Sequence, residues 1–121
     1  FATRYALNQA CVQLKKPLVS GAAIRFDGQI AVFNLRTRDS PCYQCLYPED
    51  STAEEARCAV MGVYAPLTGI IGSMQAAEAL KLLMGIGASL SGKLLIMNAL
   101  NFEVRTLALR KDKECAVCAR P

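Results

Sequence analysis

The chain has 121 residues, of which 53% are hydrophobic and 20% charged, so it has the size of one ordinary domain. This composition excludes intrinsic disorder, which requires low hydrophobicity and a large net charge. The formal net charge is +4 and the 14 lysines and arginines are scattered along the chain, so we expect no nucleic-acid partner. Histidine is absent, which excludes a Ser-His-Asp triad, a Cys-His dyad and a histidine-ligated metal built from this chain alone.

No segment of the sequence predicts a secretory leader or a membrane span. The chain opens without a charged leader followed by an apolar core, so we expect a cytoplasmic, reducing environment and no membrane partner. Residues 58–77 carry no formal charge and are numerous enough to cross a bilayer. This stretch contains Gly62, Pro66 and Gly72, however, and continues into Glu78, so we interpret it as a loop followed by a buried helix.

The first third of the chain predicts a helix followed by a β-hairpin. Residues 2–16 carry apolar side chains at helical spacing, and Pro17 ends the helix. These side chains belong to Leu7, Ala10, Cys11 and Leu14. The apolar runs 18–24 and 29–35 predict two strands, joined through an Asp-Gly pair in which Gly28 is expected to take a positive φ. Because both strands are apolar on both faces, we expect helices on both sides of the sheet, which this chain supplies only in part.

The rest of the chain predicts a long loop, a long helix and a second hairpin. Residues 36–57 are polar and contain prolines, which indicates a loop with at most one short helix. Residues 66–84 are apolar on almost every face, which predicts a long buried helix. Within this helix, Gly69 and Gly72 are expected to allow the close approach of another backbone. Two further strands complete the predicted elements, at residues 93–99 and 103–109.

Two Cys-x-x-Cys pairs, Cys42/Cys45 and Cys115/Cys118, use four of the six cysteines. Each pair places two thiolates on one turn, and two such turns complete the tetrahedral ligand set of a structural zinc ion. The protein would then fill every ligand position and leave none for a reactive water. The zinc would join the long loop to the C-terminal segment, which closes an otherwise entropically unfavourable connection.

Other chemistry for the cysteines stays open at the level of sequence. A redox dithiol or a disulfide is the alternative for one pair, although Cys42 and Cys45 lie in a predicted loop rather than at a helix start after a strand. Cys11 lies on the apolar face of the first helix and is expected to be a small core residue. Cys58 follows Arg57 in a polar loop, where the neighbouring cation favours the thiolate, so a reactive thiol and an inert one both fit its setting.

A series of short motifs runs in order along nearly the whole chain. Its members are Ser20-Gly21-Ala22-Ala23-Ile24-Arg25, Gly28-Gln29-Ile30, Pro41-Cys42-x-x-Cys45, Cys58, Gly62-Val63-x-Ala65-Pro66-Leu67-x-Gly69-x-x-Gly72-Ser73-x-Gln75-Ala76-x-Glu78-Ala79-x-Lys81, and Cys115-x-x-Cys118. In this combination the chain resembles the C-terminal half of the MoeB/ThiF/HesA family, the bacterial relatives of the ubiquitin-activating enzymes. Residues 20–25 and 65–67 look more MoeB-like than ThiF-like. The resemblance implies an α/β fold: the C-terminal part of a Rossmann-like ThiF-type domain, with a mixed sheet containing antiparallel hairpins, a buried long helix and a four-cysteine zinc site.

The resemblance also implies an activity, that of an ATP-dependent adenylyltransferase. Members of the family use MgATP to adenylate the C-terminal Gly-Gly of a ubiquitin-like sulfur carrier of the MoaD or ThiS type, for molybdopterin or thiamine sulfur transfer. An acyl-adenylate has a better leaving group than a carboxylate, so a sulfur nucleophile can then form a thiocarboxylate. The implied partners are the carrier protein, a second copy of the chain in a homodimer, and a sulfurtransferase.

Carried over residue by residue, the resemblance places five cysteines on family positions. Cys42, Cys45, Cys115 and Cys118 fall on the structural zinc ligands. Cys58 is the candidate catalytic residue, because it falls on the cysteine that ThiF-like members join to the carrier and that the ubiquitin-activating relatives use for the thioester. MoeB-like members adenylate without this cysteine, so the resemblance leaves both roles open for Cys58.

The family's nucleotide-binding motifs lie upstream of Phe1. We therefore expect residues 1–121 to be the C-terminal portion of a single ThiF/MoeB-type domain, with ATP and Mg²⁺ bound by the other half and no cofactor-binding residue in this chain. The chain alone is then expected to be inactive. The alternative is a non-enzymatic, zinc-crosslinked module that binds a ubiquitin-like protein.

Overall fold

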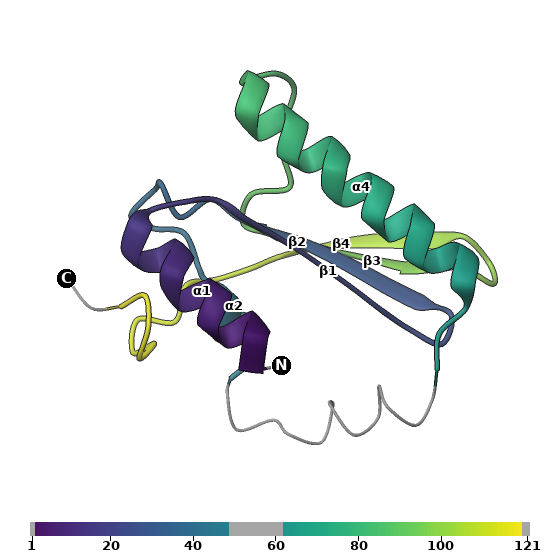
Figure 1. The fold of residues 1–121 in the computed structure, drawn as a ribbon, viewed down its shortest axis with the longest axis horizontal. Coiled ribbons are helices and arrows are strands. Elements are labelled where there is room, and N and C mark those ends of the chain that lie inside the picture. The colour runs from purple at the N-terminus through teal and green to yellow at the C-terminus, as the bar shows by residue number, and fades with distance from the viewer. Residues whose placement is uncertain (1, 49–61, 120–121) are drawn as a thin grey trace.

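The computed structural model describes residues 2–48 and 62–119, which form one β-sheet with helices on both faces (Figure 1). Adjacent strands in the order β1-β2-β3-β4 are antiparallel. The α/β fold is therefore confirmed, and within the described residues parallel pairing occurs only as two single bridges, Arg25 with Val63 and Val32 with Ser91. The elements in chain order are α1 (Ala2–Leu14), β1 (Leu18–Ile24), β2 (Asp27–Phe33), α2 (Tyr43–Leu46), α4 (Ala65–Met84), β3 (Lys93–Asn98) and β4 (Glu103–Ala108).

The sheet separates two clusters of buried side chains. Along β2, Ile30 packs with Leu67 and Ile71 of α4, whereas Phe33 belongs to a cluster with α1, α2 and the C-terminal segment. Successive strand residues point to opposite faces, so one apolar strand supplies both cores. Helices on both sides were expected, and Figure 1 shows α4 on one face with α1 and α2 on the other. Among the described residues, no helix has the length and apolar character of a membrane span.

The hairpin of β1 and β2 has a different turn from the one predicted. Arg25 and Phe26 form the turn, because Asp27 is already paired within the sheet. The residue with a positive φ, 54°, is Arg25, so the prediction of a positive φ at Gly28 is wrong. Gly28 is required for a different reason: a Cβ atom at this position would lie 2.6 Å from Cδ1 of Ile71. The missing side chain therefore allows α4 to lie close to β2.

The helix predicted over residues 2–16 is confirmed as α1, but its inner face is not the predicted one. The buried residues are Tyr5, Asn8 and Cys11, whereas Leu7 and Leu14 are exposed. The prediction failed because α1 turns the ring of Tyr5 and the amide of Asn8 toward α2, where both side chains form hydrogen bonds. Cys11 is a core residue as expected, and burial raises the pKa of its thiol.

The long helix α4 is buried along one face rather than all round. Leu67 and Ile71 are covered by the sheet, whereas Leu83 is 83% exposed. A Cβ atom placed at Gly69 or Gly72 would have no atom outside the helix backbone within 4 Å. Among the described residues, no other backbone therefore packs closely against these two glycines. The predicted burial is wrong for the outer face because the sheet covers only one side of the helix.

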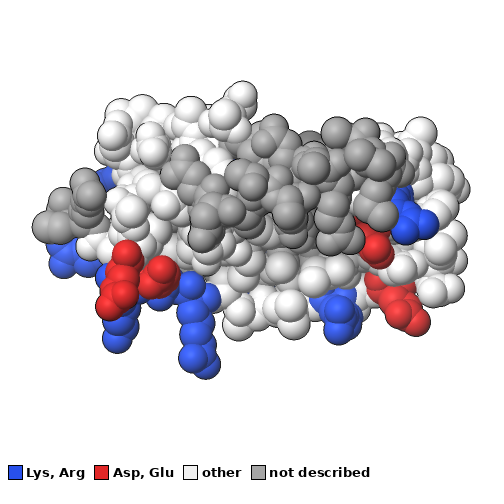
Figure 2. All heavy atoms as spheres, turned by 90° about the horizontal axis from the view of Figure 1, so that it is seen from below, with Lys and Arg blue, Asp and Glu red and all other residues white. Residues whose placement is uncertain are grey.

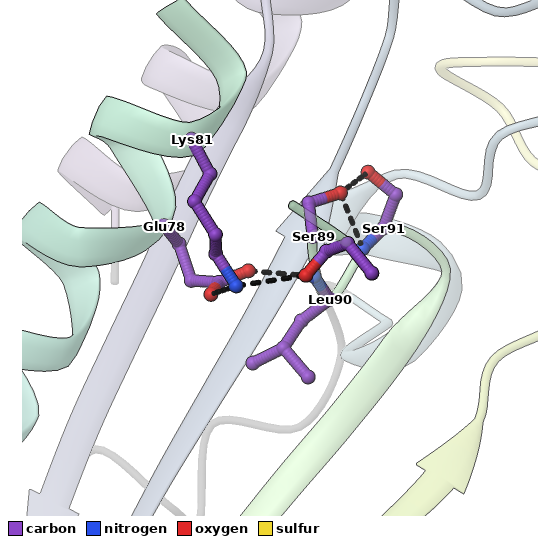
Figure 3. Close-up of polar contacts among 6 residues, drawn as sticks. Glu78, Lys81, Ser89, Leu90 and Ser91 are labelled. Atoms are coloured by element: carbon purple, nitrogen blue, oxygen red, sulfur yellow. Dashed lines mark hydrogen bonds and ion pairs between the residues drawn. The ribbon is translucent and has the colours of Figure 1, made fainter. Parts of the chain in front are cut away.

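A buried carboxylate holds the connection between α4 and β3. Glu78 accepts a hydrogen bond from the backbone N–H of Leu90 at 2.6 Å and forms an ion pair with Lys81 (Figure 3). Lys81 Nζ also donates to the carbonyl oxygen of Ala88 at 2.8 Å. α4 ends at Gly85, which adopts the left-handed conformation. The polar contacts of Glu78 thus fix the path of the chain into the sheet.

Candidate metal centre

The two Cys-x-x-Cys pairs meet on the sheet face that carries α1 and α2. Cys42 immediately precedes α2 and Cys45 lies within it, whereas Cys115 and Cys118 follow β4. The Sγ atoms of Cys42 and Cys115 lie 3.7 Å apart, and those of Cys45 and Cys118 lie 3.4 Å apart. All four Sγ atoms lie within 4.8 Å of one another. The structure therefore brings together the four residues that the sequence predicted as one site.

The sulfur positions fit a tetrahedral metal ion. A zinc ion binds thiolate sulfur at about 2.3 Å, so a regular tetrahedron of four sulfurs has edges of about 3.8 Å. The Sγ atoms within the first pair, Cys42 and Cys45, lie 3.9 Å apart. Four thiolates are the donor set that soft and borderline cations such as zinc prefer. The group can hold one such ion, and the protein supplies every ligand.

Backbone hydrogen bonds shape each cysteine turn. The backbone N–H of Cys45 donates to the carbonyl oxygen of Cys42 at 3.1 Å, and that of Ala119 donates to Cys115 at 3.2 Å. Residues three apart on such a turn lie on the same side, which brings the two sulfur atoms of a pair together. The backbone N–H of Asp112 also donates to Cys45 Sγ at 3.4 Å, which stabilises a thiolate there.

Asn8 of α1 is the residue of this site that the sequence did not predict. Its side chain is fully buried, and Nδ2 donates to Cys42 Sγ at 3.5 Å. Its Oδ1 accepts a hydrogen bond from the backbone N–H of Tyr43 at 3.0 Å, which satisfies a donor at the start of α2. One amide thus fixes both the first ligand and the helix that follows it. The only signal in the sequence is a polar residue one turn before Cys11 on the inner face of α1.

Aromatic rings pack around the buried side of the centre. The rings of Tyr5 and Tyr43 lie 5.5 Å apart in an edge-on arrangement, and those of Phe33 and Tyr43 lie 6.4 Å apart. The hydroxyl of Tyr5 donates to the carbonyl oxygen of Tyr47 at 2.8 Å. Cys42 is fully buried within the same cluster. This packing excludes water from one side of the sulfur atoms, which suits a structural site.

The thiols of the centre influence one another's ionisation. The hydrogen bond from Cys42 lowers the pKa of Cys45 to about 4, and the same hydrogen bond together with burial raises the pKa of Cys42. Burial, followed by the hydrogen bond to Cys45, raises the pKa of Cys118 to about 12. A bound cation favours the thiolate form of its ligands, because its charge offsets their mutual repulsion. The arrangement is therefore one that a cation would complete.

The other two cysteines are Cys11 and Cys58. Cys11 is buried in the core and is not among the four cysteines of the centre. Cys58, the candidate catalytic residue, lies outside the described residues.

A family comparison matches residues 1–117 to the model of the ThiF family. The chain belongs to the ThiF family. This confirms the resemblance drawn from the motif series. The assignment covers almost all of this ThiF-family chain, including both sides of the sheet.

Named relatives of this ThiF-family chain are longer than it is. It is 48% identical over 120 residues to "Adenylyltransferase and sulfurtransferase MOCS3-1" of Drosophila pseudoobscura pseudoobscura, with 98% of this chain and 26% of the relative covered. It is 47% identical over 122 residues to "Sulfur carrier protein adenylyltransferase" of Thermus thermophilus, with 98% of this chain and 45% of the relative covered. The chain thus spans from about a quarter to just under half of these relatives.

Solved structures share the fold at low sequence identity. E. coli MccB crystallised with ATP has a TM-score of 0.75 and 14% identity, and the match covers 99% of this chain and 37% of MccB. A heterocyclase in complex with substrate and cofactor has a TM-score of 0.69 and 14% identity, with 96% and 19% covered. At these identities the likeness supports a common ThiF-type fold.

Proposed function

We propose that this chain is the C-terminal portion of an ATP-dependent adenylyltransferase that activates the C-terminal Gly-Gly of a ubiquitin-like sulfur carrier of the MoaD or ThiS type. The observation that carries the proposal is 47% identity, over 98% of this chain, to a relative named as a sulfur carrier protein adenylyltransferase. Membership of the ThiF family over residues 1–117 supports the same activity.

The proposed reaction joins the terminal carboxylate of the carrier to the α-phosphate of ATP. A carboxyl-phosphate anhydride bond forms, the bond between the α- and β-phosphates breaks, and pyrophosphate leaves. A sulfur nucleophile then displaces AMP and gives a thiocarboxylate for molybdopterin or thiamine sulfur transfer. The adenylate is needed because a free carboxylate has no adequate leaving group.

This chain contributes the C-terminal portion of a single domain, residues 1–121. It contains no Gly-x-Gly-x-x-Gly motif and no Gly-Lys-Ser/Thr motif, so ATP and Mg²⁺ belong to the other half of the domain. The isolated chain is inactive in this proposal.

The cysteine centre holds a structural Zn²⁺ ion in this proposal, with Cys42, Cys45, Cys115 and Cys118 as ligands. When bound, the ion joins two distant segments and takes no part in adenylation, because all four of its positions are filled. The support is the compact group of four sulfur atoms within 4.8 Å of one another. A redox dithiol is disfavoured because both pairs converge on one point.

The role of Cys58 and the identity of the partners are inferred from the MoeB-like character of the sequence. We infer that Cys58 is dispensable for adenylation, that the protein acts in the cytoplasm as a homodimer, and that a sulfurtransferase acts beside it. Replacement of Cys58 by serine should leave adenylation intact. An inactive Cys58→Ser enzyme would instead assign this cysteine a covalent role in catalysis.

The decisive experiment measures ATP–pyrophosphate exchange by the intact polypeptide in the presence of a sulfur-carrier protein. Exchange should require the carrier and disappear when its terminal glycine is removed, because the reacting carboxylate is then displaced. Binding of the carrier without any exchange would overturn the enzymatic proposal and favour the non-enzymatic, zinc-crosslinked module.

A further inference from the structure

A basic cavity of about 510 Å³ lies beside the cysteine centre. It is bounded by the C-terminal end of α1, the loop that follows β2 and the segment that follows β4. Cys118 and Ala119 form part of its wall on the side of the metal centre. Four cationic side chains from these segments also line it, those of Lys15, Arg36, Arg38 and Lys111.

Acidic groups of the described residues do not pair with these cations. Within residues 2–48 and 62–119, none of them forms an ion pair. Lys111 Nζ donates to the carbonyl oxygen of Arg38 at 2.7 Å, and Arg36 Nε donates to Oδ1 of Asn34 at 2.9 Å. Both acceptors are neutral, so the two side chains are positioned but keep their charge and their remaining N–H donors. Figure 2 shows Lys and Arg side chains together with acidic side chains on this face of the molecule, and no acidic residue is among the described residues that line the cavity itself.

The loop that carries the arginines is held in place by its own hydroxyl groups. Thr37 Oγ1 donates to the carbonyl oxygen of Asn34 at 2.9 Å, and Ser40 Oγ donates to that of Pro41 at 2.8 Å. These hydroxyl protons are therefore not available to a ligand. The donors that remain for a ligand are the guanidinium and ammonium groups, which can only donate hydrogen bonds.

We propose that this cavity binds a small anion that carries two or more phosphate groups. Four converging positive charges repel one another and are stabilised by an anion of higher charge. Guanidinium groups match phosphate oxygens in pairs. The volume of about 510 Å³ lies within the range of small-molecule sites.

A compact ligand fits this site better than a nucleic-acid strand. The described lining contains no aromatic ring, whereas single strands are bound by grooves in which bases stack on such rings. The cations also come from three separate segments and converge on one hollow, rather than following an extended stripe. The inference goes beyond the proposed adenylation, which does not require this ligand.

The test measures equilibrium binding of inorganic pyrophosphate to the intact, metal-loaded polypeptide and to an Arg36→Ala/Arg38→Ala variant. A Lys93→Ala/Arg105→Ala variant is the matched control, because it removes two exposed charges that do not line the cavity. The arginine variant should bind pyrophosphate roughly tenfold more weakly or worse, and the control should bind as the parent does. Inorganic phosphate should bind the parent more weakly than pyrophosphate. The comparison of variant with control isolates this cavity from any nucleotide site in the same polypeptide, and carrier-dependent ATP–pyrophosphate exchange should persist in the arginine variant.

Three results would overturn the proposal. Equal pyrophosphate binding by the arginine variant and the control would exclude this cavity as the site. Loss of metal from the arginine variant would assign the cations to balancing the negative charge of the thiolates. Binding of a single-stranded RNA with which pyrophosphate does not compete would assign the cavity to nucleic acid.

Discussion

The two faces of the sheet are covered in different ways. On one face a single continuous helix, α4, packs its side chains on β1 and β2. On the other, α1, the short helix α2 and the C-terminal segment meet around the cysteines. A helix of four residues has little stability of its own, so this second face depends on links between distant segments. One face is thus held by periodic apolar packing, and the other by a few directed contacts that a metal would join.

The largest expected effect is on the cysteine face. A Cys115→Ser substitution removes one of four ligands and should lower the free energy of unfolding by on the order of 4 kcal/mol. Metal content and melting temperature of the intact protein measure the change. Cys11→Ala is the matched control, because it removes a buried thiol outside the centre and should keep the metal. An unchanged melting temperature in Cys115→Ser would contradict a metal-held face.

Acidification should also act on the cysteine face alone. The raised pKa values of Cys42 and Cys118 mean that these thiols are protonated near neutral pH before metal binds. Metal uptake therefore releases protons, and apparent affinity falls as pH falls. The pKa of Cys45, lowered from 9.0 to about 4, contributes stability that is fully present above 9.0 and lost as pH falls through about 4. Calorimetry in buffers of different ionisation enthalpy measures the protons, and uptake without proton release would contradict this account.

A Gly28→Val substitution should disturb the α4 face and spare the metal. The new Cβ would lie 2.6 Å from Ile71 Cδ1, so the Ile71 side chain or α4 itself must shift away from β2. We expect a loss of about 3 kcal/mol in chemical denaturation, with metal content unchanged. Gly69→Ala is the control: its Cβ meets open space, and the helix should gain about 0.5–1 kcal/mol. Loss of metal from Gly28→Val would show that the two faces are coupled.

An Asn8→Ala substitution tests whether directed contacts hold the cysteine face. It removes the donor to Cys42 Sγ and the side-chain acceptor for the backbone N–H of Tyr43, which should cost about 1–2 kcal/mol. Metal affinity, measured by competition with a chelator, should fall roughly tenfold or more. Asn8→Asp keeps the acceptor for Tyr43 but brings a negative charge to Cys42, so it should recover stability in metal-free protein and not metal affinity. Equal metal affinity in all three proteins would make Asn8 a packing residue only.

The smallest expected effect lies at the end of α4. A Glu78→Ala substitution removes the acceptor for Leu90 N–H and the ion pair with Lys81, and should cost about 1 kcal/mol. Glu78→Gln keeps an acceptor and loses only the partly exposed ion pair, so its loss should be about 0.5 kcal/mol. Thermal denaturation compares the two. An equal loss in Glu78→Gln and Glu78→Ala would mean that the ion pair, not the hydrogen bond, holds the loop.

The sequence predicted the elements because helix and strand periodicity are local properties. It did not predict their exposed faces, because burial depends on which element lies opposite. Leu14 and Leu83 satisfy the apolar spacing of a buried helix face, yet both side chains are exposed to solvent. The turn between β1 and β2 was misplaced for a related reason. Gly28 was assigned to the turn, whereas it is needed for the close approach of α4, a helix that begins far along the chain.

The metal centre was predictable to the extent that ligand spacing is a property of short segments. The contact of Asn8 with Cys42 spans 34 positions and leaves no local pattern. The same holds for the basic cavity, since residues 15, 36, 38 and 111 look scattered along the sequence and converge only after folding. The structure therefore adds the knowledge of which residues, distant in sequence, come together in the fold; their types were already visible in the sequence.

The separation between the two cysteine pairs has a consequence for synthesis on the ribosome. Cys118 follows Cys45 by 73 residues. At 5–20 residues per second, roughly 4–15 s pass between the emergence of the first pair and that of the second. β1 and β2 precede the first pair, and α4, β3 and β4 are translated within this interval, so the sheet and its helix can assemble before the second pair emerges. During that time the thiols of Cys42 and Cys45 are open to oxidation or to a wrong metal ion, so the nascent chain needs a reducing environment until Cys118 arrives.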